Sequence, residues 1–549
     1  MKESLQAALQ KIIKEYVKKK KAVLPDGFQA ALDLSRDPAH GDWSTAVAFR
    51  LAKLVREKPS RIAEDLVSAL KKELPSVSRF EIAGGGFINF FLPTASLAGV
   101  LIEIHKRDLE FGRSDYGRGK KVLIEFVSAN PTGPLTIAHG RQAALGDSLA
   151  RILRSSGHSV TTEYYLNDAG RQMNLLGESL WVRYLELAGQ ALPLPKEGYQ
   201  GAYLIEVAKK LLEEKKDSLL GKSKEEAIDF CRQFAAEEIL KGIKKDLEET
   251  RVSFDHYSTE SSLYREKAVE KALGLLRDRG HLYESEGALW FRSTSFGDDK
   301  DRVIRKSSGE YTYLAPDLAY HQKKFERGFE LLINLWGPDH HGYVPRLKAG
   351  CQALGYDPER VRILIVQLVT LFRKGEPVRM STRAGEFVTL RELFEEVGPD
   401  ATRFFFLLRR IESHLDFDLD LAKTQSDENP VYYLQYAHAR ISSILKFAGR
   451  RVDSNVNLER LHAPEEMELI KMLQEYPRIL ISAAQFLEPY KVVEYLRELA
   501  AQFHQFYALH RVVTEDGELT ATRLLLVDGV RIVLRNGLEV LGISHPETM

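Results

Sequence analysis

The feature that most limits how this chain can fold is a strand, turn, helix and strand in close succession from Lys121 onward. Residues 121–127 (KVLIEFV) form a short apolar run, and a turn rich in Asn, Pro and Gly follows it. A helix is expected from about residue 139 to 155, and residues 158–165 predict the next strand. Two strands joined through a helix lie parallel in one sheet. The segment therefore predicts an α/β fold with a parallel sheet.

The length of the chain predicts several domains. At 549 residues it exceeds what one hydrophobic core supports, so about three or four domains are expected. Residues 79–92 predict two strands around a glycine turn, and the pattern from residue 429 onward is helical. We expect a small N-terminal α/β domain at residues 1–112 and an all-α domain at residues 426–549. Between them, residues 113–425 should form a parallel-sheet domain with a charged helical insertion at about 175–290.

Bulk composition excludes several classes of protein. With 44% hydrophobic and 28% charged residues, the chain has the composition of an ordinary globular protein. No apolar run approaches the roughly 18–20 residues that a membrane span requires, and the N-terminus lacks the apolar core of a secretory signal. Two cysteines supply neither a disulfide framework nor a four-cysteine zinc site. We expect a cytoplasmic protein without a membrane partner and without a tightly bound metal.

Net charge gives no indication of a nucleic-acid partner. Lys plus Arg and Asp plus Glu number 78 each, so the formal charge is zero. A large protein can still bind nucleic acid through a local basic face.

A candidate phosphate-binding turn lies between the first strand and the helix of the parallel unit. It covers residues 128–140 and contains His139 close to the start of the helix. Free backbone N–H groups and the helix dipole attract phosphate at such a place. An imidazole there can donate a hydrogen bond to a phosphate oxygen that gains charge. From spacing alone, a turn with a surface histidine is the favoured alternative.

This turn resembles a signature of the class I aminoacyl-tRNA synthetases. The segment PTGPLTIAHGRQAALGD, residues 131–147, is similar to the arginyl form of that signature. The resemblance implies a Rossmann-type catalytic domain, with Thr136 and His139 acting on phosphate and Ala138 and Gly140 next to ATP. His139 falls on the second His of the signature. Thr136 replaces the first His and can still donate a hydrogen bond, whereas Ala138 replaces a Gly and adds a methyl.

Residues 378–385 resemble the second, lysine-rich signature of the same family. Met380 and Ser381 fit the arginyl version, and the resemblance places Met380 at ATP and Ser381 in catalysis. Arg379 and Thr382 replace the two lysines. Arg379 keeps the positive charge, although Arg and Lys are not interchangeable at phosphate. Arg383 is a candidate for the charge that Thr382 lacks. Without the resemblance, a surface loop is the favoured interpretation.

A second set of residues fits recognition of arginine. A guanidinium is selected by carboxylates that accept two hydrogen bonds each. Glu125 lies inside an apolar strand, where a charge needs a partner, and Tyr313 and Asp317 stand four apart on one helical face. The resemblance implies that these three residues, with Asn130 and Asp168, bind arginine. An exposed cap at a helix N-terminus is the alternative for the Tyr313 and Asp317 pair.

Two further segments complete the resemblance. Residues 336–343 include Asp339 and His340, which the resemblance places near the adenosine of ATP; a zinc site is not favoured because adjacent His side chains diverge. Residues 429–440 resemble the start of the arginyl anticodon-binding domain, with Tyr432, Tyr436 and Arg440 as candidates for tRNA binding. An aromatic core stripe is the alternative for the tyrosines.

The resemblance implies ligation of L-arginine to its tRNA through arginyl-adenylate, with ATP and Mg²⁺ as a substrate complex. The expected partners are arginine tRNA, L-arginine and ATP, and the expected oligomeric state is a monomer. The alternative is a relative that has lost catalysis and binds tRNA or nucleotide, because Thr136, Ala138 and Thr382 depart from the signatures.

Overall fold

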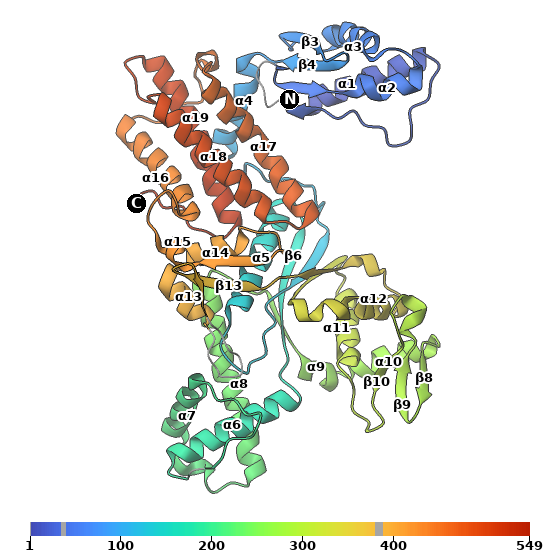
Figure 1. Ribbon diagram of the computed structural model, residues 1–549, viewed down its shortest axis with the longest axis vertical. Helices are drawn as coiled ribbons and strands as arrows, with labels where there is room; N and C mark the ends of the chain where they lie inside the picture. Colours follow the sequence, from blue (N-terminus) through green and yellow to red (C-terminus); the bar gives the residue numbers. More distant parts are fainter. Residues whose placement is uncertain (1, 35–39, 191, 379–387) are drawn as a thin grey trace. The chain divides into compact units, whose positions relative to one another are not determined.

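The computed structural model describes residues 2–34, 40–190, 192–378 and 388–549, and its elements are labelled in Figure 1. The chain forms two compact units. The first comprises residues 1–109, 443–475 and 502–532, and the second comprises residues 110–442, 476–501 and 533–549.

A five-stranded parallel sheet forms the centre of the second unit, as the sequence predicts. Its order is β12-β11-β5-β6-β7. The strands are β5 (Lys121–Glu125), β6 (Ser159–Leu166), β7 (His256–Thr259), β11 (Leu331–Trp336) and β12 (Val361–Ile365). Counted along the chain, this is the doubly wound order 3-2-1-4-5, in which the direction of winding reverses between the first and fourth strands. The fold is therefore a Rossmann-type α/β fold with its switch point between β5 and β11.

The first βαβ unit follows from its local sequence. Val122, Leu123 and Ile124 of β5 are fully buried, because both faces of a parallel sheet are covered. Helix α5 (Ile137–Ser155) returns the chain to β6 and ends before Gly157, whose φ of 85° suits glycine.

The stretch from residue 175 to 290 contains more than the helices that its charge pattern predicts. Its first part is helical, in α6 (Arg171–Leu187), α7 (Ala202–Lys215) and α8 (Lys224–Glu249). Strand β7 then adds the edge of the parallel sheet. Its sequence, HYST, carries no apolar run, because an edge strand is only partly covered. A small antiparallel sheet follows, of β8 (Leu282–Ser285), β9 (Ala288–Phe291) and β10 (Arg302–Arg305).

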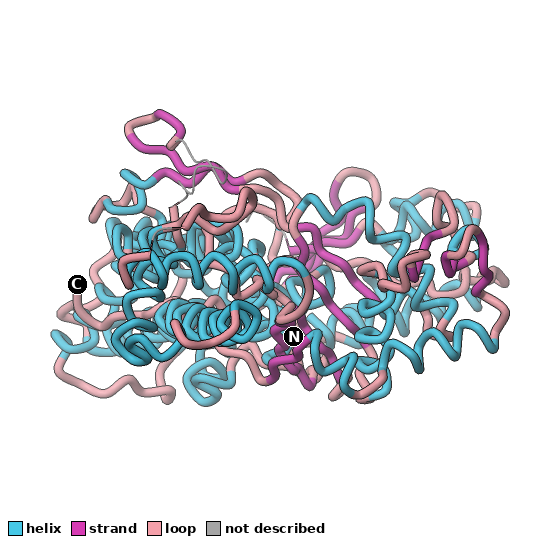
Figure 2. The backbone as a smooth tube through the Cα atoms, turned by 90° about the horizontal axis from the view of Figure 1, so that it is seen from below, coloured by secondary structure: helices cyan, strands magenta, loops and turns pink. Residues whose placement is uncertain are grey.

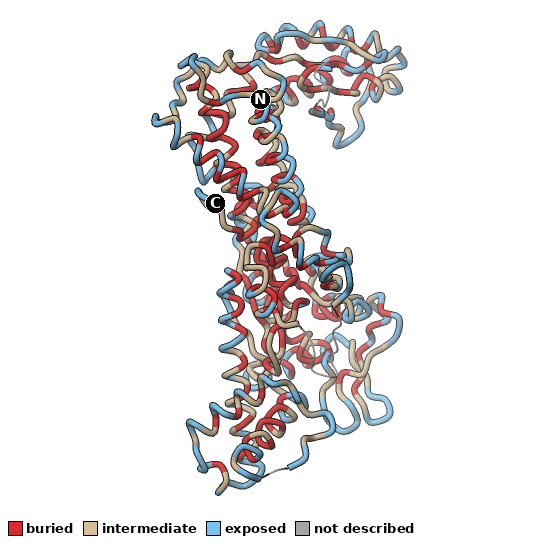
Figure 3. The backbone as a smooth tube through the Cα atoms, turned by 60° about the vertical axis from the view of Figure 1, so that its left-hand side comes forward, coloured by how far each residue is buried: buried red, intermediate tan, exposed pale blue. Residues whose placement is uncertain are grey.

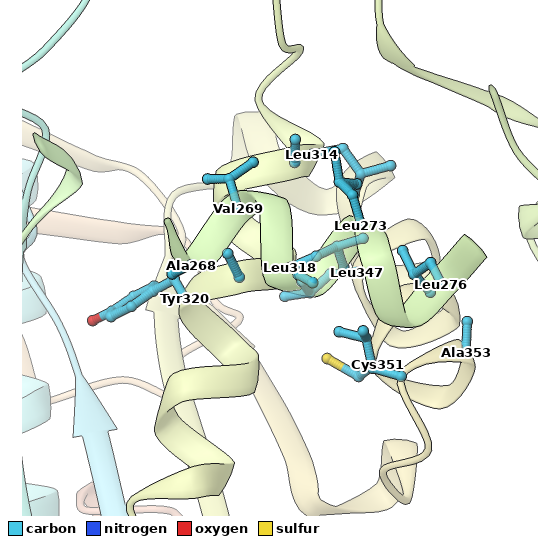
Figure 4. Close-up of a cluster of buried hydrophobic side chains, with 14 of the residues drawn as sticks. Ala268, Val269, Leu273, Leu276, Leu314, Leu318, Tyr320, Leu347, Cys351 and Ala353 are labelled. Atoms are coloured by element: carbon cyan, nitrogen blue, oxygen red, sulfur yellow. The ribbon is translucent and has the colours of Figure 1, made fainter. Parts of the chain in front are cut away.

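Helix α11 (Leu314–Glu326) is held by a hydrophobic cluster that it shares with α10 (Ala268–Asp278) and α12 (Val344–Ala353). Leu318 projects into this cluster, and Figure 4 shows Tyr320 at its margin with the hydroxyl directed outward. The packing fixes the polar face of α11 toward the central sheet.

The remaining elements of the second unit include a three-stranded sheet and four short helices. They are β13 (Val369–Arg373), β14 (Glu376–Pro377), β15 (Leu415–Asp418), α9 (Glu260–Arg265), α13 (Leu390–Val397), α14 (Pro399–Leu407) and α15 (Leu419–Lys423).

The first unit contains the small N-terminal α/β part that the sequence predicts. A four-stranded antiparallel sheet has the order β1-β2-β4-β3. Its strands and the helices of this part are β1 (Asp33–Leu34), β2 (Trp43–Thr45), β3 (Arg79–Ala83), β4 (Phe87–Phe91), α1 (Lys2–Lys19), α2 (Val47–Val55), α3 (Pro59–Glu73) and α4 (Thr94–Arg107).

From residue 430 onward the chain is helical. Figure 2 distinguishes the helices of the chain, in cyan, from its strands, in magenta. The long helices are α16 (Pro430–Ala448), α17 (Pro464–Phe486), α18 (Tyr490–Leu509) and α19 (Gly517–Val540). Each buries one face, as Figure 3 shows in red, and Leu434, Ala437 and Ile441 form the buried stripe of α16. Among the helices of the described ranges, none has the length and apolarity needed to cross a bilayer.

Candidate active site

A cleft of about 880 Å³ opens at the carboxyl ends of β5, β6 and β11. The turn after β5, the start of α5 and the start of α11 complete its wall. In doubly wound sheets, ligands bind at the carboxyl ends of the strands beside the switch point. The cleft occupies this position, and it contains the candidate residues Glu125, Asn130, His139, Tyr313 and Asp317.

The turn after β5 has a backbone that ordinary residues rarely adopt. Val127 and Ser128 have φ angles of 66° and 40°, and a β-branched residue such as valine seldom tolerates a positive φ. The Ser128 side chain holds the turn in place: its hydroxyl donates to Oε1 of Glu125 at 3.1 Å and accepts the backbone N–H of Tyr165 at 3.1 Å. The turn is thereby joined to both β5 and β6.

His139 stands in the first turn of α5 and lines the cleft. Its Nδ1 accepts the backbone N–H of Thr136 at 3.1 Å. Nδ1 therefore carries no proton, so the proton of the neutral ring is on Nε2. Burial lowers the pKa of His139 to about 4, which keeps the ring neutral at physiological pH. The side chain is a hydrogen-bond donor through Nε2, as a phosphate ligand requires.

The residues that follow the second signature pair with the backbone of the first signature. Thr389 forms a β-bridge with Thr136, and the backbone N–H of Leu390 donates to the carbonyl of Leu135 at 2.8 Å. The four residues predicted from the second signature lie outside the described residues: Arg379, Met380, Ser381 and Arg383.

Asp317 is an acidic group in an environment that disfavours its charge. It lies in the first turn of α11, and its Oδ2 accepts the hydroxyl of Tyr343 at 2.7 Å. Burial, together with the nearby carboxylates of Glu125 and Glu260, raises the pKa of Asp317 to about 7. A cationic ligand would relieve this repulsion, so the site is suited to a guanidinium.

Glu125 is the second carboxylate of the cleft, and internal donors hold both of its oxygens. Ser128 donates to Oε1, and the ammonium group of Lys324 donates to Oε2. Lys324 is fully buried. The sequence did not single out this lysine, because it stands in a charged stretch, HQKKFE, that also contains the surface residue Lys323. Each carboxylate oxygen has a second lone pair, so Glu125 can still accept from a ligand.

The other predicted ligands of the cleft line its rim. Asn130 donates to the side chain of Gln172 at 2.8 Å, and Tyr313 is 75% exposed at the start of α11. Ala138, Asp339 and His340 also line the cleft and are exposed to solvent. These side chains are accessible to a ligand without rearrangement of the core.

Three residues predicted at arginine or ATP lie away from the lining: Thr136, Gly140 and Asp168. Gly140 is buried, and a Cβ there would meet Leu390 at 2.5 Å and Phe406 at 3.0 Å, so glycine is required for helix packing. Asp168 accepts the backbone N–H and the hydroxyl of Ser261, at 2.9 and 2.6 Å. This contact joins the end of β6 to the start of α9.

The tRNA-binding candidates are presented by one face of α16. Tyr432 and Tyr436 stack with ring centroids 6.3 Å apart and an interplanar angle of 8°. Tyr436 is 38% exposed, and Arg440 is exposed as well. The pair therefore lies outside the buried stripe of this helix.

Across the part of the chain that the structure describes, no three His, Cys, Asp or Glu side chains are grouped so as to hold a metal ion.

Comparison with known proteins identifies the family. Residues 1–92 match the arginyl tRNA synthetase N terminal domain, residues 103–405 match the class I (R) tRNA synthetase catalytic domain, and residues 434–549 match the DALR anticodon binding domain.

Similar proteins match along almost the whole chain. The chain is 49% identical over 557 residues to an arginine–tRNA ligase of Geobacter sp. (strain M21), which covers 100% of both chains. It is 49% identical over 531 residues to that of Geobacillus kaustophilus, covering 96% of this chain and 95% of the relative. A crystal structure of a putative arginyl-tRNA synthetase from Campylobacter jejuni is 34% identical, with a TM-score of 0.78, and covers 83% of this chain and 100% of that one. The chain belongs to the arginyl-tRNA synthetase family of class I.

Proposed function

We propose that this chain ligates L-arginine to arginine tRNA at the expense of ATP. The observation that carries the proposal is the pair of carboxylates, Glu125 and Asp317, in a cleft at the switch point of the sheet. The phosphate-binding turn with His139 lies in the same cleft. A cationic amino acid and a nucleotide can therefore bind side by side.

The first step joins arginine to the nucleotide. An oxygen of the arginine carboxylate attacks the α-phosphorus of ATP, the bond to the β-phosphate breaks, and pyrophosphate leaves with the electron pair. Mg²⁺ enters as part of the ATP substrate. His139 donates its Nε2–H to a phosphate oxygen whose charge increases in the transition state. We propose that Ala138, Asp339, His340 and Met380 contact ATP and that Thr136, Arg379, Ser381 and Arg383 assist at its phosphates.

Selection of arginine follows from the acidic cleft. Asp317 and Glu125 accept hydrogen bonds from the planar guanidinium, with Tyr313 and Asn130 completing its contacts. We propose that Asp168 contacts the amino group of the substrate. Lysine presents a compact ammonium and leaves some of these acceptors unpaired. Buried polar groups without partners discriminate strongly between analogues, so no editing step is required.

The second step transfers the arginyl group. A ribose hydroxyl of the terminal adenosine of the tRNA attacks the carbonyl carbon of the adenylate, and AMP leaves. We propose that Tyr432, Tyr436 and Arg440 bind bases of the tRNA, since exposed aromatic rings and arginine planes stack on unpaired bases. We also propose that the first step requires tRNA. A monomer in the cytoplasm remains a prediction from the sequence.

Arginine-dependent exchange between ATP and pyrophosphate tests the proposal, with and without arginine tRNA, across a panel of amino acids. Among the amino acids, we expect only arginine to support exchange, and only when arginine tRNA is present. Absence of exchange under every condition, with tRNA binding intact, would support the alternative of a tRNA-binding relative without catalysis.

A further inference from the structure

Lys324 is a buried cation behind the two carboxylates of the cleft. Besides Glu125, its Nζ donates to Oδ1 of Asn334 at 3.2 Å, and it lies 4.0 Å from the ring centroid of Tyr320. Asn334 belongs to β11 and is fully buried, so this cluster bridges β5, β11 and α11 at the switch point. A charge removed from water in this way is tolerated only with such partners.

The cluster continues to the backbone that carries Asp317. Because lysine only donates, Oδ1 of Asn334 must face Lys324, and the amide nitrogen donates to Nε2 of His321 at 2.8 Å. The proton of His321 is then on Nδ1, which donates to the carbonyl of Asp317 at 2.8 Å. Burial lowers the pKa of His321 to about 3, so its ring is neutral and adds no charge. Lys324 is thus linked to both carboxylate-bearing positions.

Other groups around Asp317 do not replace the charge of Lys324. Glu125 on β5 and Glu260 on α9 both raise the pKa of Asp317, whereas Tyr343 and Lys324 lower it. Tyr343 contributes a hydrogen bond without a charge. Tyr165 on β6, Tyr264 on α9 and Cys351 on α12 also interact with Asp317 and carry no positive charge. Arg346 on α12 lines the same cleft, and its guanidinium lies 5.1 Å from the ring centroid of Tyr343.

Arg327, a second cation near Lys324, is engaged by a different acid. It forms an ion pair with Glu163, which also accepts the hydroxyl of Tyr320 at 2.6 Å. Burial opposes ionisation of Glu163, but Lys324, Tyr320 and Arg327 together hold its pKa below the usual range. Arg327 is therefore committed to Glu163.

We propose that Lys324 is a positioning residue for arginine binding: it fixes the carboxylate of Glu125 and supplies a positive charge that opposes protonation of Asp317 before arginine enters. The inference rests on the proposed function and adds to it a residue that does not touch the substrate. Around Asp317, the carboxylates of Glu125, Asp317 and Glu260 outnumber the single buried ammonium of Lys324, so this end of the cleft attracts a guanidinium. Without that cation, mutual repulsion favours protonation of Asp317, and a protonated carboxyl loses its charge–charge attraction for arginine.

The test compares four substitutions in the full chain. Lys324→Met removes the charge with little change of volume, Lys324→Gln keeps a donor for Glu125 without a charge, and Lys324→Arg keeps the charge. Lys323→Met is the matched control, because Lys323 is the neighbouring residue on α11 and pairs at the surface with Glu266. For each protein, the KM for arginine, the KM for ATP and kcat are measured in tRNA-dependent exchange from pH 6 to 9.

We expect the KM for arginine at pH 7 to rise about fivefold in Lys324→Met and Lys324→Gln, since raising the pKa of Asp317 from about 7 by one unit lowers its ionised fraction from about one half to about one tenth. The increase in the KM for arginine should diminish toward pH 9, where Asp317 ionises in the variants as well. The KM for ATP should change little. Lys324→Arg should retain the wild-type pH profile, and Lys323→Met should match the wild type throughout. If Lys324→Met does not fold, Lys324→Gln carries the same comparison, because its amide still pairs with Glu125.

Two outcomes would overturn the inference. One is that folded Lys324→Gln has the same KM for arginine as the wild type and the same midpoint in its pH profile. The other is an increase in KM that is independent of pH and equal for arginine and ATP, because such an increase indicates a structural role alone. Failure of the proposed function is distinct, because wild-type protein would then show no arginine-dependent exchange.

Discussion

At the scale of single residues, the charge of Asp317 links stability to arginine binding. Its folded pKa of about 7 exceeds its ordinary value of 3.8, so the folded protein holds a proton that the unfolded chain has lost. The stability from this proton is complete below pH 3.8 and is lost as the pH rises through about 7. We expect Asp317→Asn to raise the unfolding temperature relative to wild type at pH 8 but not at pH 4, while the KM for arginine rises at least about tenfold.

Calorimetry at pH 4 and pH 8 measures the unfolding temperature, and steady-state ATP–pyrophosphate exchange measures the KM for arginine. Glu326→Gln is the matched control, because Glu326 is an exposed carboxylate on the same helix. A parallel pH dependence of wild type and Asp317→Asn would contradict the assignment of a raised pKa.

His139 provides a second prediction at this scale. Because burial lowers its pKa to about 4, the ring should not gain a proton between pH 5.5 and 8. His139→Gln should lower kcat by about 10²-fold, the cost of removing one preorganised donor to a developing negative charge. NMR titration of the imidazole resonances checks the first statement, and exchange kinetics check the second. A midpoint near 6.5 would show that the ring is not buried in solution.

At the scale of elements, Arg141 connects α5 to two distant loops. It is fully buried, and its guanidinium donates to the carbonyls of Gln367, Ser413 and Arg410 at 2.8, 2.9 and 3.0 Å. Arg141→Met would leave these buried acceptors without donors, so we expect a loss of at least about 2 kcal/mol in unfolding free energy. Arg154→Met on the same helix, whose ion pair with Asp255 is largely exposed, should cost less than about 1 kcal/mol.

Denaturant unfolding of both variants makes this comparison. Equal losses in the two variants would mean that the carbonyls near Arg141 find other donors.

At the scale of the whole molecule, Arg403 joins segments that are far apart in the chain. It is buried and bonds to Asp147 on α5, to the carbonyl of Thr250 after α8, and to the carbonyl of Leu541 after α19. Gly542 permits this contact, because a Cβ there would lie 2.2 Å from the guanidinium. Arg403→Met should destabilise the second unit by about 3 kcal/mol, since it leaves a buried carboxylate without this partner.

Thermal unfolding measured by calorimetry tests this prediction. Arg251→Met serves as the comparison, because Arg251 is partly exposed and also donates to the C-terminal segment, at the carbonyl of Gly542. If the transition of Arg403→Met coincides with that of wild type, the buried ion pair contributes no net stability.

Local sequence signals were enough to predict the class of fold and several of the side chains that face the cleft. An apolar run, a turn, a helix ending at glycine and a second strand specify a parallel sheet, because each signal is local and the connection permits no other pairing. Glu125 was recognisable because a charge in an apolar strand needs a ligand or a partner. Asp317 was recognisable only through the resemblance, because an acid at a helix start by itself favours an exposed cap.

The groups behind those side chains come from distant parts of the chain and could not be predicted from local signals. Lys324 pairs with Glu125 across 199 residues of sequence, and Gly140 serves helix packing against Leu390. Strand β7 belongs to the sheet only through its pairing with β6, although its own residues are polar. Such features depend on which distant segments meet when the core forms. A local pattern records the propensity of a segment, whereas the partner of a buried charge is set by packing between segments.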